Sequence, residues 1–408
     1  PPGDTRVYNF GQNPTFSGSL TAGTYTDGNG KGLFKYQPPS GFLALCEDNL
    51  PAPAIADPGD YFKTILYTGD GNTGRSITGV GFKPDLVWIK RRNGASDHVL
   101  QDSVRGFGPT TKLASSSNQH ENDTDSGGSY GITDPQWGYL TSADEDGFSL
   151  SDTGTADQVN YSGSPYVAWC WKAGGAAVSN TDGSLTTQVS VNQDVGFSIG
   201  TYTGDVANTH TIGHGLGKVP SMVIVKERTA NSGWAVYHKD RGNTKVSYLN
   251  YTDAEYTETG DTSSWNATDP TSSVFYVGKN GATNDNTLVF YAWAEIAGFS
   301  KFGSYVATGN ADGPFVYCGF KPAWVMIKPT SFASNWIIMD SSRGPVNPDL
   351  GWLYPDGAFA EDTGSSRYCD FLSNGFKIRN GGTGLNSTNN TYIFAAFAES
   401  PFQTANAK

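Results

Sequence analysis

The stretch GFKPDLVWIK at residues 81–90 decides the fold, because it recurs as GKVPSMVIVK at 217–226 and as GFKPAWVMIK at 319–328. An Arg-Gly pair follows each copy at the same distance. Equivalent residues lie 136 positions apart between copies one and two, and 102 positions apart between copies two and three. A register held without a gap predicts three diverged repeats of one structural unit. The landmarks of the repeat are Pro84, Lys90, Arg105, Pro220, Lys226, Arg241, Pro322, Lys328 and Arg343.

Each landmark residue has a physical role in a strand that follows a turn. Proline holds φ at about −65° and has no N–H, so it suits the first position of a strand. Alternation along the strand places Val87 and Ile89 on one face and Lys90 on the other. A partner strand is expected to follow, beginning at Trp234 in copy two. The arginine after it carries a fork of donors for turn carbonyls, so we interpret it as structural rather than ligand-binding.

The rest of each copy also indicates β structure. Each copy begins with a strand that ends in a turn, as at 62–69, and closes with an aromatic strand, as at 166–171. The chain has 51 Gly, 21 Pro, 10 Trp, 21 Tyr and 22 Phe, which suit short strands, tight turns and thin aromatic cores. The sequence predicts an all-β chain of three tandem β-sandwich repeats of jelly-roll or concanavalin-like type. We place them at 61–178, 179–297 and 298–408, after an extended N-terminal arm and linker at 1–60.

The order of elements predicts how the copies follow one another. A domain whose first and last elements are strands can pair them side by side, which brings its two ends together. The copies are therefore expected to form a compact row or arc. A pseudo-threefold arrangement remains an alternative, because unequal spacings need only reflect loop insertions.

The net charge and the hydropathy of the chain argue against two partners, nucleic acid and the membrane. With 39 acidic and 27 basic residues the net charge is −12, so the surface should repel nucleic acid. No apolar run approaches the roughly 20 residues of a membrane helix, so no membrane insertion is expected. The chain starts at Pro1 without an initiator Met, which leaves open either processing or a longer precursor.

The four cysteines are too few and too scattered for a disulfide framework or a zinc site. We expect buried thiols and no bound metal. Cys318 and Cys369 fall within one repeat, and their pairing is left open.

Candidate binding residues are aromatic, because sugar sites use aromatic faces beside carboxylates and amides. Four aromatic residues lie in polar, loop-like stretches and are our candidate platforms: Trp137, Tyr139, Trp265 and Trp352. The excess length of copy one, Ser115 to Gly131, is rich in Ser, Asn, Asp and Gly and predicts an extended surface loop, where binding residues are often found.

Other chemistry finds little support in the sequence. His210 and His214 flank a Gly-containing turn in which their spacing has no helical meaning, so a metal site there is disfavoured. Acidic clusters at 123–125 and 144–147 offer oxygens of the kind that calcium takes, but neither has the EF-hand pattern. Solvated loop charge is the favoured interpretation, and calcium is the alternative. No catalytic motif occurs in a supporting context, so we expect no enzymatic activity and no cofactor.

Two stretches carry a resemblance to known proteins. PSGFLALCEDNLP at 39–51 resembles the closing segment of concanavalin-like or SPRY-like domains in virion proteins of tailed marine bacteriophages. The segments GDYFKTILYTGDG (59–71), GFKPDLVWIKRRN (81–93), DSVRG (102–106) and VAWCWKAGG (167–175) are similar to a repeat that follows such domains in tail fibres. Copy two departs from this pattern at Lys218-Val219 and at Lys239-Asp240, so the three copies need not bind the same ligand.

The resemblance implies a virion structural and adhesive protein, a tail fibre or appendage subunit that contacts host-surface glycans. It implies a location at the virion surface or outside the cell, with further copies of the chain, a trimer above all, and other virion proteins as partners. A capsid-decorating protein, a glycan-degrading enzyme and a secreted bacterial adhesin are the alternatives. Fold analogy alone cannot separate them.

Overall fold

The computed structural model describes residues 21, 23–50, 53–123, 133–151, 157–348, 351–364, 369–379 and 381–401. The chain divides into two compact units, Pro1–Pro53 and Ala54–Lys408. The predicted boundary at residue 60 is therefore a few residues too late. Ile55 belongs to a core of the second unit, and the 3-10 helix η2 (Pro58–Asp60) contacts β24 (Thr391–Pro401).

The described part of the first unit folds back on itself, and in this respect the expectation of an extended arm is wrong. The Asp27 carboxylate accepts hydrogen bonds from the backbone N–H groups of Lys31 (2.8 Å) and Ala44 (2.8 Å). A short bridge pairs Tyr25 with Phe34, and the 3-10 helix η1 spans Glu47–Asn49. One buried carboxylate thus organises a turn-rich segment.

The second unit consists of β-strands in two layers per copy, and the prediction of an all-β sandwich fold is confirmed. Copy one has an inner sheet β1-β7-β3-β4 and an outer sheet β2-β6-β5. Its strands are β1 (Phe62–Thr68), β2 (Arg75–Thr78), β3 (Leu86–Arg91), β4 (Val99–Asp102), β5 (Leu140–Asp144), β6 (Gly147–Leu150) and β7 (Pro165–Trp171).

Copy two extends this plan, with the inner order β15-β14-β13-β12-β17-β10-β9-β8 and an outer pair β11-β16. Its strands are β8 (Val178–Asn180), β9 (Thr187–Asn192), β10 (Phe197–Gly204), β11 (His210–Gly213), β12 (Met222–Glu227), β13 (Trp234–His238), β14 (Lys245–Tyr248), β15 (Tyr256–Thr257), β16 (Val274–Val277) and β17 (Asn286–Trp293). The predicted limit between residues 178 and 179 falls inside β8.

Copy three repeats the plan of copy one, with an inner sheet β18-β24-β20-β21 and an outer sheet β19-β23-β22. Its strands besides β24 are β18 (Ser300–Val306), β19 (Phe315–Tyr317), β20 (Phe320–Pro329), β21 (Ile337–Asp340), β22 (Cys369–Leu372) and β23 (Gly375–Ile378). Among the residues that the structure describes, two α-helices occur, each of four residues: α1 (Gly281–Asn284) and α2 (Thr383–Asn386). No helix in the described ranges has the length and apolar character to span a membrane.

Two predictions about the strands can be checked directly. In copies one and three the first strand pairs antiparallel with the last, as β1 with β7 and β18 with β24, which confirms the expected pairing. In copy two the closing strand β17 pairs with β10, the strand that begins at Phe197, and β8 and β9 precede it. Pro84 and Pro220 were expected at the first position of their strands, but β3 and β12 each begin two residues later, and Pro322 lies inside β20. The register shifts on both sides of Pro322, and a bulge tolerates a residue that lacks an N–H.

Alternation along each inner sheet buries both of its faces. Val87 and Ile89 pack with Phe148 in the core between the two layers of copy one. Leu86 and Trp88 point the other way, into a shared core to which all three copies contribute. The aromatic residues of the shared core are Phe62, Trp88, Trp169, Trp171, Phe197, Trp234, Tyr291, Trp293, Phe299, Phe302, Trp324, Trp336 and Phe397. The three sandwiches therefore share one core and are not separate domains joined by linkers.

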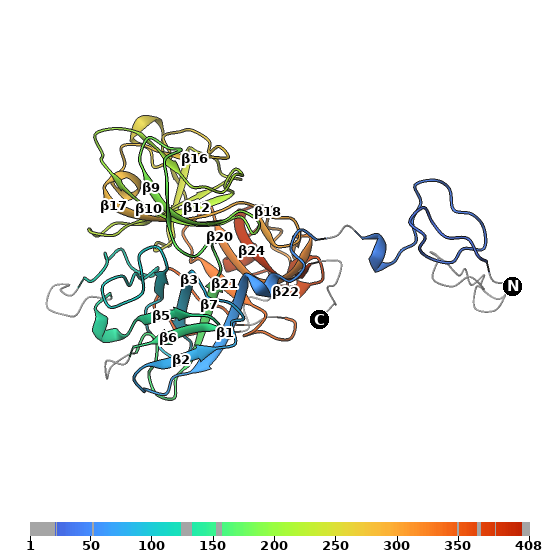
Figure 1. The fold of residues 1–408 in the computed structure, drawn as a ribbon, viewed down its shortest axis with the longest axis horizontal. Helices are drawn as coiled ribbons and strands as arrows, with labels where there is room; N and C mark the ends of the chain where they lie inside the picture. The colour runs from blue at the N-terminus through green and yellow to red at the C-terminus, as the bar shows by residue number, and fades with distance from the viewer. Residues whose placement is uncertain are drawn as a thin grey trace. The chain divides into compact units, whose positions relative to one another are not determined.

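The copies close into a ring, so the expectation of a compact row or arc is wrong and the pseudo-threefold alternative holds. Each copy sends one loop onto the next copy, and the third returns to the first. The equivalent backbone hydrogen bonds run from Ser232 N–H to Asn118 O (2.9 Å), from Ser334 N–H to Thr252 O (2.7 Å) and from Ser96 N–H to Ala358 O (2.8 Å). In Figure 1 the strands of the three copies form three groups, coloured blue to green, green to yellow and orange to red.

Candidate functional site

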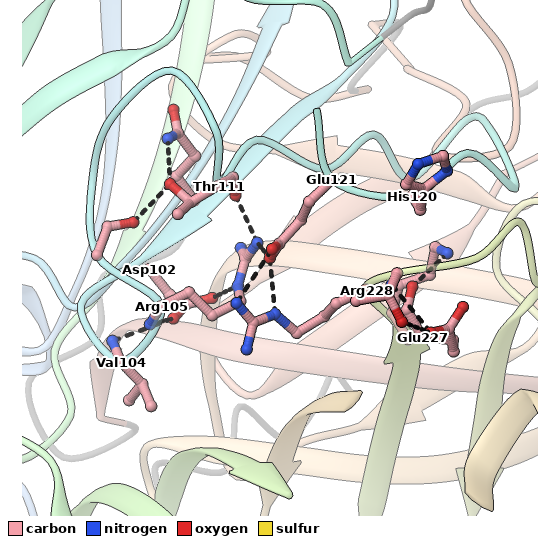
Figure 2. A network of polar contacts seen from close by, with 12 residues as sticks. Asp102, Val104, Arg105, Thr111, His120, Glu121, Glu227 and Arg228 are labelled. Atoms are coloured by element: carbon pink, nitrogen blue, oxygen red, sulfur yellow. Dashed lines mark hydrogen bonds and ion pairs between the residues drawn. The ribbon is translucent and has the colours of Figure 1, made fainter. Parts of the chain in front are cut away.

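The landmark arginine of copy one lies in a buried ion network (Figure 2). The Nε of Arg105 is 2.5 Å from an oxygen of Asp102, and its Nη1 is 2.7 Å from Glu121. The Arg105 side chain is fully buried and also donates to the carbonyls of Leu100 and Thr111. The structural interpretation of this arginine is confirmed, because its donors are used within the protein.

The same network joins copy one to copy two. Arg228 of copy two holds both oxygens of Glu121, at 2.9 and 3.0 Å, and Figure 2 shows it reaching that carboxylate beside Arg105. The hydroxyl of Tyr291, on β17, donates to Asp102 over 2.7 Å. Buried charge at this junction is therefore paired from both copies, as burial requires.

An equivalent network joins copy three to copy one. The fully buried Arg343 pairs with Asp340 (2.6 Å) and Glu361 (2.7 Å). Arg92 of copy one reaches Glu361 over 2.7 Å, and the indole of Trp169 donates to Asp340 over 3.0 Å. A buried ion network of the same kind therefore joins copy one to copy two and copy three to copy one, and the second of these closes the ring.

Copy two differs from copies one and three at the position of the network aspartate and in the surroundings of its arginine. Only the first of these differences is visible in the sequence. His238 replaces the aspartate, and Arg241 pairs with Glu255 at 2.6 Å with 27 % of its side chain exposed. The N–H of Asp240 donates to His238 Nδ1, which leaves Nε2 to donate to the Phe394 carbonyl of copy three (3.2 Å). Burial lowers the pKa of His238 to about 4, so the imidazole acts as a neutral donor.

The three landmark lysines are wholly buried, which the sequence does not indicate. Lys226 donates to the carbonyl of Asn118 in copy one (3.2 Å), and Lys328 donates to that of Thr252 in copy two (2.9 Å). Lys90 donates to Arg91 O over 2.6 Å within its own copy. Burial lowers the pKa of Lys90 to about 7 and of Lys226 and Lys328 to about 8. Lys226 and Lys328 therefore join neighbouring copies, and all three amines are costly to protonate where they lie.

The buried amines predict that the free energy of unfolding rises between pH 7 and pH 9. Burial also lowers the pKa of Lys112 to about 7, against an ordinary value of 10.5, so in this range the unfolded chain binds more protons than the folded one. Above about pH 9 the rise should slow, because burial raises the pKa of Cys170 and Cys318 and only the unfolded thiols ionise. It should reverse only near about pH 10, the ordinary pKa of tyrosine, because burial also raises the pKa of Tyr67, Tyr202, Tyr291 and Tyr305. Urea unfolding at pH 7, 8, 9 and 10 measures the profile. Lys226→Met should flatten the rise, and a fall in stability from pH 7 to 9 would contradict the assignment.

Three surface clefts lie beside the residue that follows each partner strand. The 1/2 cleft, where copy one leads into copy two, measures about 670 Å³; the 3/1 cleft measures about 410 Å³ and the 2/3 cleft about 370 Å³. Each contains two lysines. Their polar and aromatic lining residues include Lys83, Asp85, Ser103, Phe107 and Lys172 in the 1/2 cleft, Lys63, Lys321, Ser341 and Glu399 in the 3/1 cleft, and Lys239, Asp240, Lys301, Phe315 and Tyr317 in the 2/3 cleft.

The 2/3 cleft presents exposed aromatic rings beside charged groups. Phe315 and Tyr317, both on β19, are 44 % and 60 % exposed. Lys239 and Lys301 each bind Glu295 at 2.6 Å. Burial alone would raise the pKa of Glu295, but the hydrogen bonds and charges of these two amines outweigh it and the pKa lies below its ordinary value. Aromatic faces next to fixed polar groups are suited to stacking on a polar ring.

The structure does not support Trp265 and Trp352 as binding platforms. Both are buried, at 2 % and 0 % exposure. Trp265 packs against Tyr237 and Phe275 between the layers of copy two, and Trp352 lies in the equivalent core of copy three. Their polar neighbours in sequence misled the prediction, because a loop residue can point inward.

The other predicted binding residues lie apart from the clefts. Trp137, at the end of the 3-10 helix η3 (Pro135–Trp137), and Tyr139 are half-buried and belong to none of the three linings given above. The expected surface loop is described as far as Asp123, and the rest of it lies outside the described residues. Ser115 is buried and donates to the Pro355 carbonyl (2.8 Å), so this part joins copies and is not a free loop.

Two of the acidic candidates for calcium, Asp144 and Asp146, accept hydrogen bonds within the protein, and Asp125 lies outside the described residues. Asp144 accepts from Ser142 and Ser149, and Asp146 accepts from the N–H groups of two glycines. No group of three or more potential ligands for a metal was found in the part of the chain that the structure describes. All four cysteines are described, and no disulfide joins them.

A serine, a histidine and an aspartate also lie in contact. Ser184 Oγ is 3.3 Å from His210 Nδ1, and His210 Nε2 is 3.3 Å from Asp205. The ring nitrogens are exchanged relative to a catalytic triad, and Ser184 Oγ accepts from the N–H of Thr211 (2.9 Å). Asp205 is half-exposed, and none of the three belongs to the cleft linings given above, so we interpret the contact as structural.

The sequence analysis missed Phe315 and Tyr317, although a signal for them exists. β19 reads Phe-Val-Tyr, and its burial alternates exposed, buried, exposed. Two aromatic residues at the outward positions of one short strand form an exposed apolar patch, and such patches often mark binding surfaces. The lysines of the clefts carry no comparable signal, since the tertiary structure alone gathers them.

Comparison with known proteins identifies a family, and the function of that family is unknown. A family model described as a domain of unknown function (DUF7483) matches residues 57–401. No curated protein and no solved structure matches the chain. The matched range corresponds to the second unit, with its ring of three copies.

Proposed function

Since the chain belongs to the DUF7483 family, whose function is unknown, we propose from its own geometry that it is a structural and adhesive protein that binds carbohydrate through the 2/3 cleft. The pair of outward rings on β19, Phe315 and Tyr317, carries this proposal. An aromatic face stacks on the C–H face of a sugar ring, and the neighbouring Asp240 and Lys239 supply hydrogen-bond partners for hydroxyls.

The frame around the cleft supports this function. β19 belongs to copy three, whereas Lys239 and Asp240 follow β13 of copy two, so the relative position of the two sides depends on the closed ring. The shared core and the buried ion networks hold the copies together. A binding site on such a frame loses little conformational entropy when it binds a ligand.

The resemblance to tail-fibre proteins supplies the biological setting of the proposal. It supports a subunit of a virion appendage, located at the virion surface, that assembles with further copies of itself, as a trimer. The glycans of a host cell surface are then the ligands that the cleft meets.

Binding to an array of bacterial surface polysaccharides tests the proposal. Tyr317→Ala is expected to weaken the binding of a recognised glycan about tenfold or more, because stacking is lost while the backbone of β19 remains. Tyr256→Ala is the matched control, since this ring is 43 % exposed but lies outside the cleft. Equal losses in the two variants, or no glycan bound by the unmodified chain, would refute the proposal.

A further inference from the structure

We propose that the 1/2 cleft is a second binding site, which takes the anionic group of an acidic saccharide such as a hexuronate. Lys83 and Lys172 line it in a chain whose net charge is −12. Among the described residues neither amine has a carboxylate within 4 Å. Two cations without an internal counter-ion in an otherwise acidic protein favour an anion from outside.

In the other two clefts, most of the lysines form an ion pair with a carboxylate of the protein. In the 2/3 cleft Glu295 binds both amines, and in the 3/1 cleft Lys321 binds Glu399 at 2.6 Å. Lys63 of the 3/1 cleft has no carboxylate within 4 Å among the described residues, so the 1/2 cleft differs in that neither of its two amines has one. The carboxylate that lines the 1/2 cleft, Asp85, is engaged elsewhere. Its two oxygens accept from the Ser103 hydroxyl (2.6 Å) and the Ala173 N–H (2.7 Å). These neutral donors hold Asp85 away from both amines but do not cancel its charge, so the two lysines and one aspartate leave the 1/2 cleft an excess of one positive charge for an anionic ligand.

Aromatic contacts hold one of the two amines in place. Lys172 Nζ lies 5.6 Å from the centre of the Tyr61 ring and 5.9 Å from that of Phe82. These contacts restrain the amine without neutralising it, so less side-chain freedom is lost when an anion binds.

The size and lining of the cleft indicate a saccharide rather than a small inorganic anion. A cleft of about 670 Å³ is larger than one sulfate or carboxylate needs. Its walls include Phe107 and the hydroxyl-bearing Thr141 and Ser142, which suit a polar ring. The choice of a saccharide rests on the proposed adhesive function, whereas the anion site itself rests only on the two lysines.

Titration calorimetry with trigalacturonate, maltotriose and inorganic phosphate tests the inference. Trigalacturonate is expected to bind the full chain, and to do so more weakly as salt is raised. Lys83→Met and Lys172→Met should each reduce its affinity about tenfold, while Lys83→Arg should retain it. Lys218→Met is the control, because this exposed lysine lies outside the cleft. Circular dichroism establishes that each variant is folded.

The outcomes separate this inference from the proposed function. If Tyr317→Ala abolishes glycan binding but leaves trigalacturonate binding intact, both sites stand and are distinct. If the array finds no glycan while trigalacturonate binding depends on Lys83 and Lys172, the proposed function fails and the anion site stands. Binding of phosphate as tight as that of trigalacturonate would overturn the choice of a saccharide. Equal binding of maltotriose, or no loss in the two methionine variants, would overturn the site.

Discussion

Replacing Arg105 by Met is expected to lower the free energy of unfolding by about 3–5 kcal/mol, the cost of leaving buried charge without its partner. Asp102 is fully buried and Glu121 nearly so, and both lose the guanidinium that they share. Arg228 and Tyr291 of copy two would still contact these carboxylates. The buried network would then hold two carboxylates and only one guanidinium. Because this network joins copy one to copy two, the substitution should weaken the contact between the two copies and not only the turn that carries Arg105.

Arg241→Met is the matched control, since it removes the same landmark in copy two. There 27 % of the side chain is exposed and Glu255 also has Lys245 nearby, at 3.6 Å. A partly exposed ion pair contributes about 1 kcal/mol or less, so a much smaller loss is expected. Urea unfolding at neutral pH measures both variants. Equal losses would mean that the buried network adds nothing beyond an ordinary surface pair.

The second large effect is expected for Phe397→Ala, which should cost about 3–5 kcal/mol through a cavity in the shared core. The ring of Phe397 contacts Phe62 and Trp171 of copy one, at 5.3 and 5.7 Å between centroids. It also contacts Trp293 of copy two at 6.4 Å and Trp324 of its own copy at 5.7 Å. One side chain thus packs against all three sandwiches.

This position tests whether the ring unfolds as a unit. If the shared core couples the copies, calorimetry of Phe397→Ala should show one transition shifted to lower temperature. Phe359→Ala is the control, because that ring is 60 % exposed and should change the transition little. A separate early transition for copy three, with the other two copies unchanged, would show that the sandwiches are independent.

Much of the fold can be predicted from local pattern. The register of the three copies predicts equivalent strands, and alternation places Val87 opposite in direction to Lys90, as the structure has it. The turn residues and the aromatic closing strands predict the pairing of β1 with β7, β10 with β17 and β18 with β24. These features depend on neighbours in the chain, so the sequence reports them directly.

The candidate sites could not be predicted in the same way. Trp352 has polar neighbours and is fully buried, whereas Tyr317 lies in an apolar strand and is 60 % exposed. Lys83 and Lys172 are far apart in the sequence, and only the pairing of β3 with β7 brings their surroundings together. Exposure and proximity are properties of packing, and no local pattern of residues encodes them.

By itself the sequence determined that this protein consists of three diverged copies of a β-sandwich, with strands whose two faces differ and whose landmark arginines serve the fold. Only the tertiary structure decided that the copies close into a ring, that the landmark lysines are buried at its junctions, and that clefts with aromatic rings and amines lie beside them. The physical reason is that strand periodicity follows from the backbone geometry of adjacent residues. Ring closure depends on the second faces of three inner sheets meeting in one core, a contact between residues more than a hundred positions apart.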